Sequence, residues 1–188
     1  MSNAEEAAAD ALGDDRWDRA SIAGAWVLDL ERSDTFEEYL RCLGTPEAAI
    51  QAQIAGERAY QSRNLIALDE SRLVIYKDTA LNNFYERYEL DREEITLSDP
   101  DGGVRQSSAS TGEGGRLDSF VIATTARAPP PSQRNSETLE ARQLLEGGRS
   151  HVQQINVRNL VTGAECVVIR HWVRVPLTAE DQSRLRNS

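Results

Sequence analysis

The stretch GAWVLDLERSDTFEEYLRCLG, residues 24–44, joins two kinds of secondary structure with almost no connection between them. Over residues 22–31 the apolar side chains recur at every second position, which is the period of a β-strand. From residue 33 onward they recur at i, i+3, i+4 and i+7, which is the stripe of an amphipathic helix. The strand face consists of Ile22, Gly24, Trp26, Leu28 and Leu30, and the helix stripe of Phe36, Tyr39, Leu40 and Leu43. The sequence therefore predicts a strand that runs directly into a helix.

A second helix is predicted immediately after the first. Ser33 or Asp34 can cap the first helix, because their side chains can accept hydrogen bonds from the first turn. Pro46 suits the first turn of a new helix, which Gly56 would end. The apolar edge of this second helix consists of Ile50 and Ile54.

The rest of the chain has the pattern of short β-strands separated by turn residues. Glycines in DPDGG at 99–103 and in EGGR at 113–116 and 146–149 tolerate the positive φ angles of hairpin turns. With the first strand, these make ten predicted strands. The nine that follow the helices cover residues 59–68, 72–78, 83–90, 94–98, 103–110, 115–126, 136–145, 149–158 and 164–175.

Ten consecutive strands predict an all-β fold, a ten-stranded antiparallel up-and-down β-barrel of the β-clam type. A long meander closes on itself because closure removes open edges, and a barrel of ten strands can hold a cavity. The helix-turn-helix between the first two strands would be a lid. We expect an acidic N-terminal tail at 1–21, the barrel at 22–176, and a tail or short helix at 177–188, where Thr178 and Asp181 have capping-box spacing.

Composition excludes several classes of function. The net charge of −10, without a cationic cluster, opposes nucleic-acid binding. No apolar run has the length of a membrane span, and no signal peptide is apparent, so we expect a cytoplasmic protein without stable membrane insertion. Cys42 and Cys166 lack metal-binding spacing and are expected to be reduced. We predict no cofactor, no metal, no catalytic residues and a monomer.

Four short motifs resemble the intracellular lipid-binding proteins, a calycin-like family that includes fatty-acid-binding and cellular retinoid-binding proteins. The first two are GAW at 24–26 and TFEEYLRCLG at 35–44. The others are LEARQLLEGGR at 139–149 and CVVIRHW at 166–172. The resemblance covers residues 22–175 and is weak in the middle. It implies a barrel that holds a hydrophobic ligand.

The resemblance also implies a ligand-binding site. In fatty-acid and retinoic-acid binders, two arginines and a tyrosine meet the ligand carboxylate, and the matching positions here hold Arg142, Arg170 and Trp172. Two arginines favour an acidic ligand. Trp172 departs from the pattern, because an indole N–H donates a hydrogen bond but cannot accept one. The lid position makes Phe36, Tyr39 and Ile54 candidate pocket residues.

Pattern and resemblance disagree on where Arg170 points. Alternation alone would bury Val167, Ile169 and Val173 and leave Arg170 in solvent, whereas the family register turns Arg170 inward. Arg142 also has two interpretations, as a head-group ligand or as the partner of Glu140 in a structural ion pair. The sequence alone leaves both interpretations open for Arg170 and for Arg142.

The first functional hypothesis is a cytosolic, non-enzymatic carrier of a long-chain fatty acid or a similar hydrophobic carboxylate. The alternative is an isomerase or cyclase on a lipocalin-like barrel, for which His151 and Glu140 are weak acid–base candidates. An interaction module that uses the tails and the proline-rich insertion RAPPPSQRNS, residues 127–136, is a third hypothesis. Strand counting places this insertion at the same end of the barrel as the helices.

Overall fold

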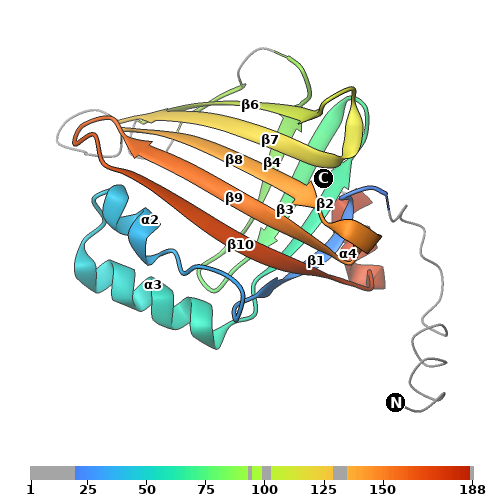
Figure 1. The fold of residues 1–188 in the computed structure, drawn as a ribbon, viewed down its shortest axis with the longest axis horizontal. Helices are drawn as coiled ribbons and strands as arrows, with labels where there is room; N and C mark the ends of the chain where they lie inside the picture. Colours follow the sequence, from blue (N-terminus) through green and yellow to red (C-terminus); the bar gives the residue numbers. More distant parts are fainter. Residues whose placement is uncertain (1–19, 93–94, 99–102, 129–134, 187–188) are drawn as a thin grey trace.

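The computed structural model describes residues 20–92, 95–98, 103–128 and 135–186. They form one ten-stranded antiparallel sheet in the order β4-β3-β2-β1-β10-β9-β8-β7-β6-β5 (Figure 1). The strands are β1 (Gly24–Asp29), β2 (Arg63–Leu68), β3 (Arg72–Asp78), β4 (Asn83–Glu89), β5 (Ile95–Ser98), β6 (Val104–Gly112), β7 (Arg116–Arg127), β8 (Ser136–Leu144), β9 (Ser150–Asn159) and β10 (Glu165–Val175). The sheet curls into a nearly closed barrel, because the first strand pairs with the last.

The predicted fold class is therefore confirmed. Every strand pairs with its neighbour in the sequence except β4 and β5, which are the two ends of the sheet order. The helix pair α2 (Glu37–Cys42) and α3 (Glu47–Ala59) connects β1 to β2, as predicted. We call the end of the barrel with these helices the helix end and the other end the closed end.

Both helices differ from the prediction at their termini. Ser33 and Asp34 do not cap α2, because they bind β10 instead: Asp34 Oδ2 accepts from Ile169 N at 2.8 Å and Ser33 Oγ from His171 N at 2.8 Å. α2 consequently begins only at Glu37. Gly56 does not end α3, which continues to Ala59 and so brings one further turn of helix to the barrel.

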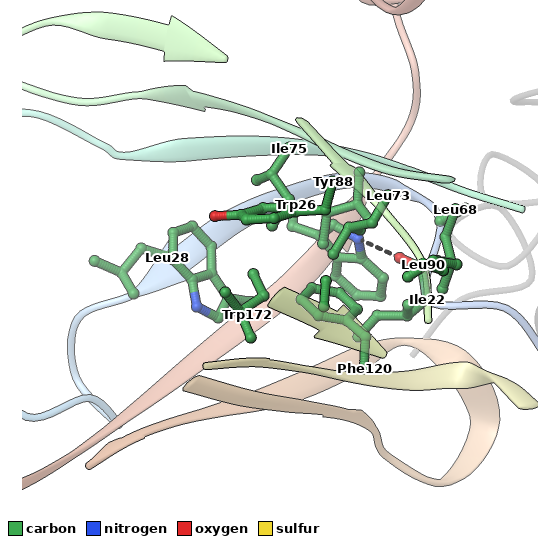
Figure 2. Packing of buried hydrophobic residues seen from close by; sticks show 14 residues of the cluster. Ile22, Trp26, Leu28, Leu68, Leu73, Ile75, Tyr88, Leu90, Phe120 and Trp172 are labelled. Atoms are coloured by element: carbon green, nitrogen blue, oxygen red, sulfur yellow. Dashed lines mark hydrogen bonds between the residues drawn. The ribbon is translucent and has the colours of Figure 1, made fainter. Parts of the chain in front are cut away.

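The apolar core fills the closed end (Figure 2). Trp26 is fully buried there, and its indole N–H donates to the carbonyl of Ile22 at 2.9 Å. Residues of this cluster come from opposite sides of the barrel and include Ile22, Leu68, Leu73, Leu90 and Phe120. In the described part of the barrel, the core thus occupies the end opposite the helices.

Gly24 of the GAW motif is required by close packing. Its φ is +144°, and a Cβ at this position would lie 2.8 Å from Nη1 of Arg174. That guanidinium donates to the carbonyls of Ala23 and Ser21, so it ties β10 to the start of the barrel. Residues 1–19 of the predicted tail lie outside the described residues, but Ser21 is already part of the folded barrel.

A third helix, α4 (Ala179–Arg186), packs outside the barrel. The capping box forms as its spacing suggests: Thr178 N donates to Asp181 Oδ2, and Asp181 N donates to Thr178 Oγ1. Leu177 and Leu185 pack against Leu65 and Tyr76, whose side chains point out of the barrel. Among the described residues no helix has both the length and the apolar character to cross a membrane.

Candidate functional site

Two arginines lie side by side inside the barrel at the helix end. Arg142 on β8 and Arg170 on β10 are each 1% exposed. Gln153 on β9 is the register partner of both, so the three side chains form a row across adjacent strands. The inward alternative for Arg170 is therefore the one that the structure adopts.

The valine face of β10 points outward instead. Val167 is 52% exposed and Val173 is 38% exposed. Alternation misassigned this strand because the rule assumes an apolar interior, whereas this end of the barrel has a polar one.

Each arginine is paired with a carboxylate whose side chain is at most 12% exposed. Arg142 Nε donates to Glu140 Oε1 at 2.7 Å, and Arg170 Nη2 donates to Glu57 Oε1. Burial alone would raise the pKa of Glu140, but the Arg142 guanidinium and then Lys77 outweigh it and hold that pKa below its usual value. Burial lowers the pKa of Arg170, and Glu57 opposes this effect. The structural ion pair considered for Arg142 thus exists, and Arg170 has one that the sequence did not indicate.

Aromatic rings cover both guanidinium groups. The Arg170 guanidinium carbon is 4.2 Å from the ring centre of Phe36, and that of Arg142 is 5.5 Å from the ring centre of Trp172. These cation–π contacts stabilise buried cations. The Trp172 indole N–H donates to Gln153 Oε1 at 2.9 Å, so Trp172 orients the amide between the two arginines.

Several buried polar atoms of this cluster have no hydrogen-bond partner among the described residues. They are Nη2 of Arg142, Nε and Nη1 of Arg170, and Oε2 of Glu57. Arg142 Nη1 is satisfied by the Asn64 side-chain oxygen at 2.9 Å when the Asn64 amide is oriented toward it. The unpaired atoms are mostly donors, and burying a donor without an acceptor costs about 1–3 kcal/mol. The cluster is therefore suited to an acceptor-rich group.

A cavity of about 250 Å³ adjoins the two arginines. It extends between α3 and the turn after β3, where Leu81 is 70% exposed. Helix and turn approach each other beside it, so that a Cβ added to Gly56 would lie 3.4 Å from Cβ of Ala80. Its wall consists of Phe36, Gln53, Glu57, Ser62, Asn64, Lys77, Thr79, Ala80, Leu81, Asn82, Phe84, Arg142, Gln153, Arg170 and Trp172.

The structure brings four of the six predicted ligand-binding residues to this cavity. Arg142, Arg170, Trp172 and Phe36 line it, whereas Tyr39 and Ile54 are not among its described lining residues. Ile54 belongs to the small core between the helices, formed with Leu40 and Ile50, whereas Tyr39 packs against this core and its hydroxyl lies near Thr138 and Glu140 of the barrel. A pair of short helices needs this core to hold together, so Ile54 packs between the helices and not on the cavity wall.

Glu57 and Gln153 are the site residues that sequence reasoning missed. Glu57 lies just past Gly56, where the predicted helix ended, so it was not placed on the lid. Gln153 offered a weak signal, because alternation on β9 puts it on the inward face with His151.

The acid–base candidates of the enzyme hypothesis are not among the described residues that line the cavity. Glu140 is engaged with Arg142. His151 is fully buried between Trp26 and Trp172, with ring centres 4.5 and 6.0 Å away. Burial, followed by the charges of Arg142 and Arg174, lowers the pKa of His151 well below its ordinary value.

The two cysteines, distant in sequence, come together at the helix end. Cys42 on α2 donates its thiol to the carbonyl of Ala164 at 3.3 Å, and both cysteines are free. Burial and the neighbouring Cys42 thiol raise the pKa of Cys166 to about 11. Within the described residues, no group of three or more His, Cys, Asp or Glu side chains is arranged to hold a metal ion.

A comparison with solved structures shows that the chain shares its fold with fatty-acid-binding and lipid-binding proteins. No family model and no curated protein sequence matches the chain. Among solved structures, the REP1-NXSQ fatty acid transporter matches with TM-score 0.59 and 16% identity over 84% of this chain and 98% of that one. Apo lipid binding protein 8 of Caenorhabditis elegans matches with TM-score 0.57 and 16% identity over 82% and 95%. A Schistosoma mansoni fatty acid binding protein in complex with arachidonic acid matches with TM-score 0.59 and 14% identity over 84% and 98%. The predicted resemblance is confirmed at the level of the fold.

Proposed function

We propose that this chain, which has the fold of the fatty-acid-binding proteins, binds a long-chain fatty acid or a similar hydrophobic carboxylate inside its barrel. The observation that carries the proposal is the pair of buried arginines on the cavity wall, with three nitrogens that have no acceptor among the described residues. A carboxylate supplies strong acceptors for these donors, and its hydrogen bonds to guanidinium are charge-assisted.

The tail of the ligand would extend from the arginines toward Leu81. The wall on this path includes the apolar side chains of Phe36, Ala80 and Phe84. Each buried methylene contributes about 0.8 kcal/mol, so the tail supplies most of the affinity and the arginines select the head group. The cavity of about 250 Å³ is slightly below the usual range for ligand sites, roughly 300–1,000 Å³. A long tail therefore requires α3 and the β3–β4 turn to separate.

The proposed role is that of a cytosolic carrier that acts as a monomer and releases its ligand unchanged. Free thiols at Cys42 and Cys166 agree with a reducing compartment. Mass spectrometry of the ligand after incubation tests the absence of turnover. A changed ligand mass would favour an enzyme.

The direct test is calorimetry with hexadecanoate and hexadecan-1-ol, which differ only in the head group. In Arg170→Gln the acid should bind at least about 30-fold more weakly, because losing one partner of a buried charge pair costs about 2–5 kcal/mol. The alcohol should bind nearly as before.

Arg158→Gln is the matched control, since Arg158 lies on β9, is exposed, and pairs with Glu165 on the surface. It should leave both affinities unchanged. No binding of hexadecanoate to the wild-type protein, or an equal loss for acid and alcohol in Arg170→Gln, would contradict the proposal.

A further inference from the structure

The carboxylate that pairs with Arg170 comes from the helix pair. Glu57 is in the last turns of α3 and is 7% exposed, and its Oε1 accepts from Arg170 Nη2. It therefore occupies part of the position that the proposed function assigns to the ligand's head group. The inference below rests on that proposed function.

The two internal carboxylates differ in how they are held. Glu140 lies two residues from Arg142 on β8, whose backbone pairs along its length with β7 and β9, so the sheet holds the backbones of these two residues at a fixed separation. Glu57 is on a helix whose buried side chains, Ile50 and Ile54, form a small core between the helices. Of the two carboxylates, Glu57 is the one that can leave.

Charge balance at the cavity requires one carboxylate to leave. The described cations that line the cavity are each paired with an acid: Arg142 with Glu140, Arg170 with Glu57, and Lys77 with Glu86 at 2.8 Å. A ligand carboxylate beside Arg170 would add a negative charge next to Glu57. Two carboxylates that share one buried site repel each other strongly.

We propose that Glu57 is an internal stand-in for the ligand carboxylate, which an entering anionic head group displaces from Arg170. Displacement releases the C-terminal end of α3 from Arg170, in addition to the separation of α3 from the β3–β4 turn that a long tail of either ligand requires. A ligand with a neutral head group leaves the ion pair intact. Glu57 therefore sets the affinity for acids and couples their binding to the helix pair.

The variant that tests this is Glu57→Gln, which removes the competing charge. Hexadecanoate should bind at least about fivefold more tightly than to the wild type, at the lower end of typical coupling effects, and hexadecan-1-ol should bind as before. Glu47→Gln is the matched control: Glu47 is on the same helix and pairs with Arg41 at the surface. It should change neither affinity.

Hydrogen exchange of the amides of residues 54–59 gives a second measurement. In the wild type, hexadecanoate should accelerate their exchange relative to hexadecan-1-ol, because both ligands carry the same tail and only the acid displaces Glu57. In Glu57→Gln, exchange should already be fast without ligand. If Glu57→Gln does not fold, Glu57→Asp withdraws the carboxylate by one methylene and should change affinity and exchange in the same directions by a smaller factor.

The outcomes separate this inference from the proposed function. If the wild type binds no hexadecanoate, the proposed function fails and the inference fails with it. If hexadecanoate binds and Arg170→Gln weakens it selectively, but Glu57→Gln binds the acid equally or more weakly, the inference is wrong and the proposed function stands. Equal exchange rates of α3 with acid and with alcohol in the wild type would also overturn the inference.

Discussion

Asn159 shows how one side chain holds the helix pair to the barrel. It is fully buried at the end of β9, and its Nδ2 donates to the carbonyl of Cys42 in α2 at 2.8 Å. Its Oδ1 accepts from the backbone N–H groups of Val161 and Thr162 in the following turn. The Asn159 side chain therefore uses both its N–H donor and its oxygen acceptor in buried hydrogen bonds.

Asn159→Asp should lower the free energy of unfolding by at least about 1–3 kcal/mol, because it removes the donor from a buried carbonyl and places a carboxylate oxygen beside it. Urea denaturation measures the loss. Asn156→Asp is the control, since Asn156 is on the same strand but points outward to a longer contact with the Leu139 carbonyl at 3.5 Å. Comparable losses in the two variants would show that burial of Asn159 is unimportant.

At the scale of the element, the strands were predictable from sequence and the helix termini were not. Apolar residues at every second position, bounded by turn glycines, predict strand bounds close to those of the structure. They do so because the geometry of a hairpin depends on residues that are neighbours in the sequence. The start of α2 depends on Ser33 and Asp34 binding β10, a contact between segments about 135 residues apart. Glu57 and Arg170, which pair with each other, are also more than a hundred residues apart in the sequence. Patterns within one short segment do not predict contacts between residues so far apart in the sequence.

The helix α4 is an element whose contribution can be measured by removing it. Truncation after Pro176 would expose Leu65 and Tyr76 and break the ion pair of Arg63 with Asp181. Unfolding free energy should fall by about 2–4 kcal/mol, the range for exposing one or two apolar side chains. Hexadecanoate affinity should persist, because α4 packs on the outer face of the barrel. Glu180→Gln, which removes only a surface ion pair, is the control, and an unchanged stability of the truncated chain would contradict this account.

At the scale of the whole molecule, the strand order followed from the sequence, whereas the charge balance of the interior did not. A meander closed by its first and last strands follows from ten antiparallel runs. The predicted insertion, residues 127–136, has its described flanks at the helix end: Leu160 N donates to the Asn135 carbonyl, and the adjacent Asn159 donates to Cys42 of α2. Residues 129–134 lie outside the described residues. The pairing of the two arginines with acids involves side chains of β8, β10 and the helix α3. The sequence pattern of a single strand therefore does not predict this charge balance.

The charge of the helix pair predicts how ligand would be transferred to membranes. Residues 34–59 have a net charge of −3, from Asp34, Glu37, Glu38, Glu47 and Glu57 against Arg41 and Arg58. An anionic lipid surface repels such a segment. Transfer of a fluorescent fatty acid to vesicles should therefore not depend on vesicle concentration or anionic lipid content. A rate that rises with vesicle concentration would indicate transfer by collision.

The position of Trp172 gives the protein an optical signal of its own. Both Trp172 and Trp26 belong to the apolar core cluster, but of the two only Trp172 is among the described residues that line the cavity, where its indole lies beneath the Arg142 guanidinium. Indole emission responds to nearby charge, so an anion that arrives at Arg142 would change the field more strongly at Trp172 than at Trp26. With Trp17 replaced by phenylalanine, these two would be the remaining tryptophans of the chain. Occupancy of the barrel could then be followed in real time by fluorescence, without a label on protein or lipid.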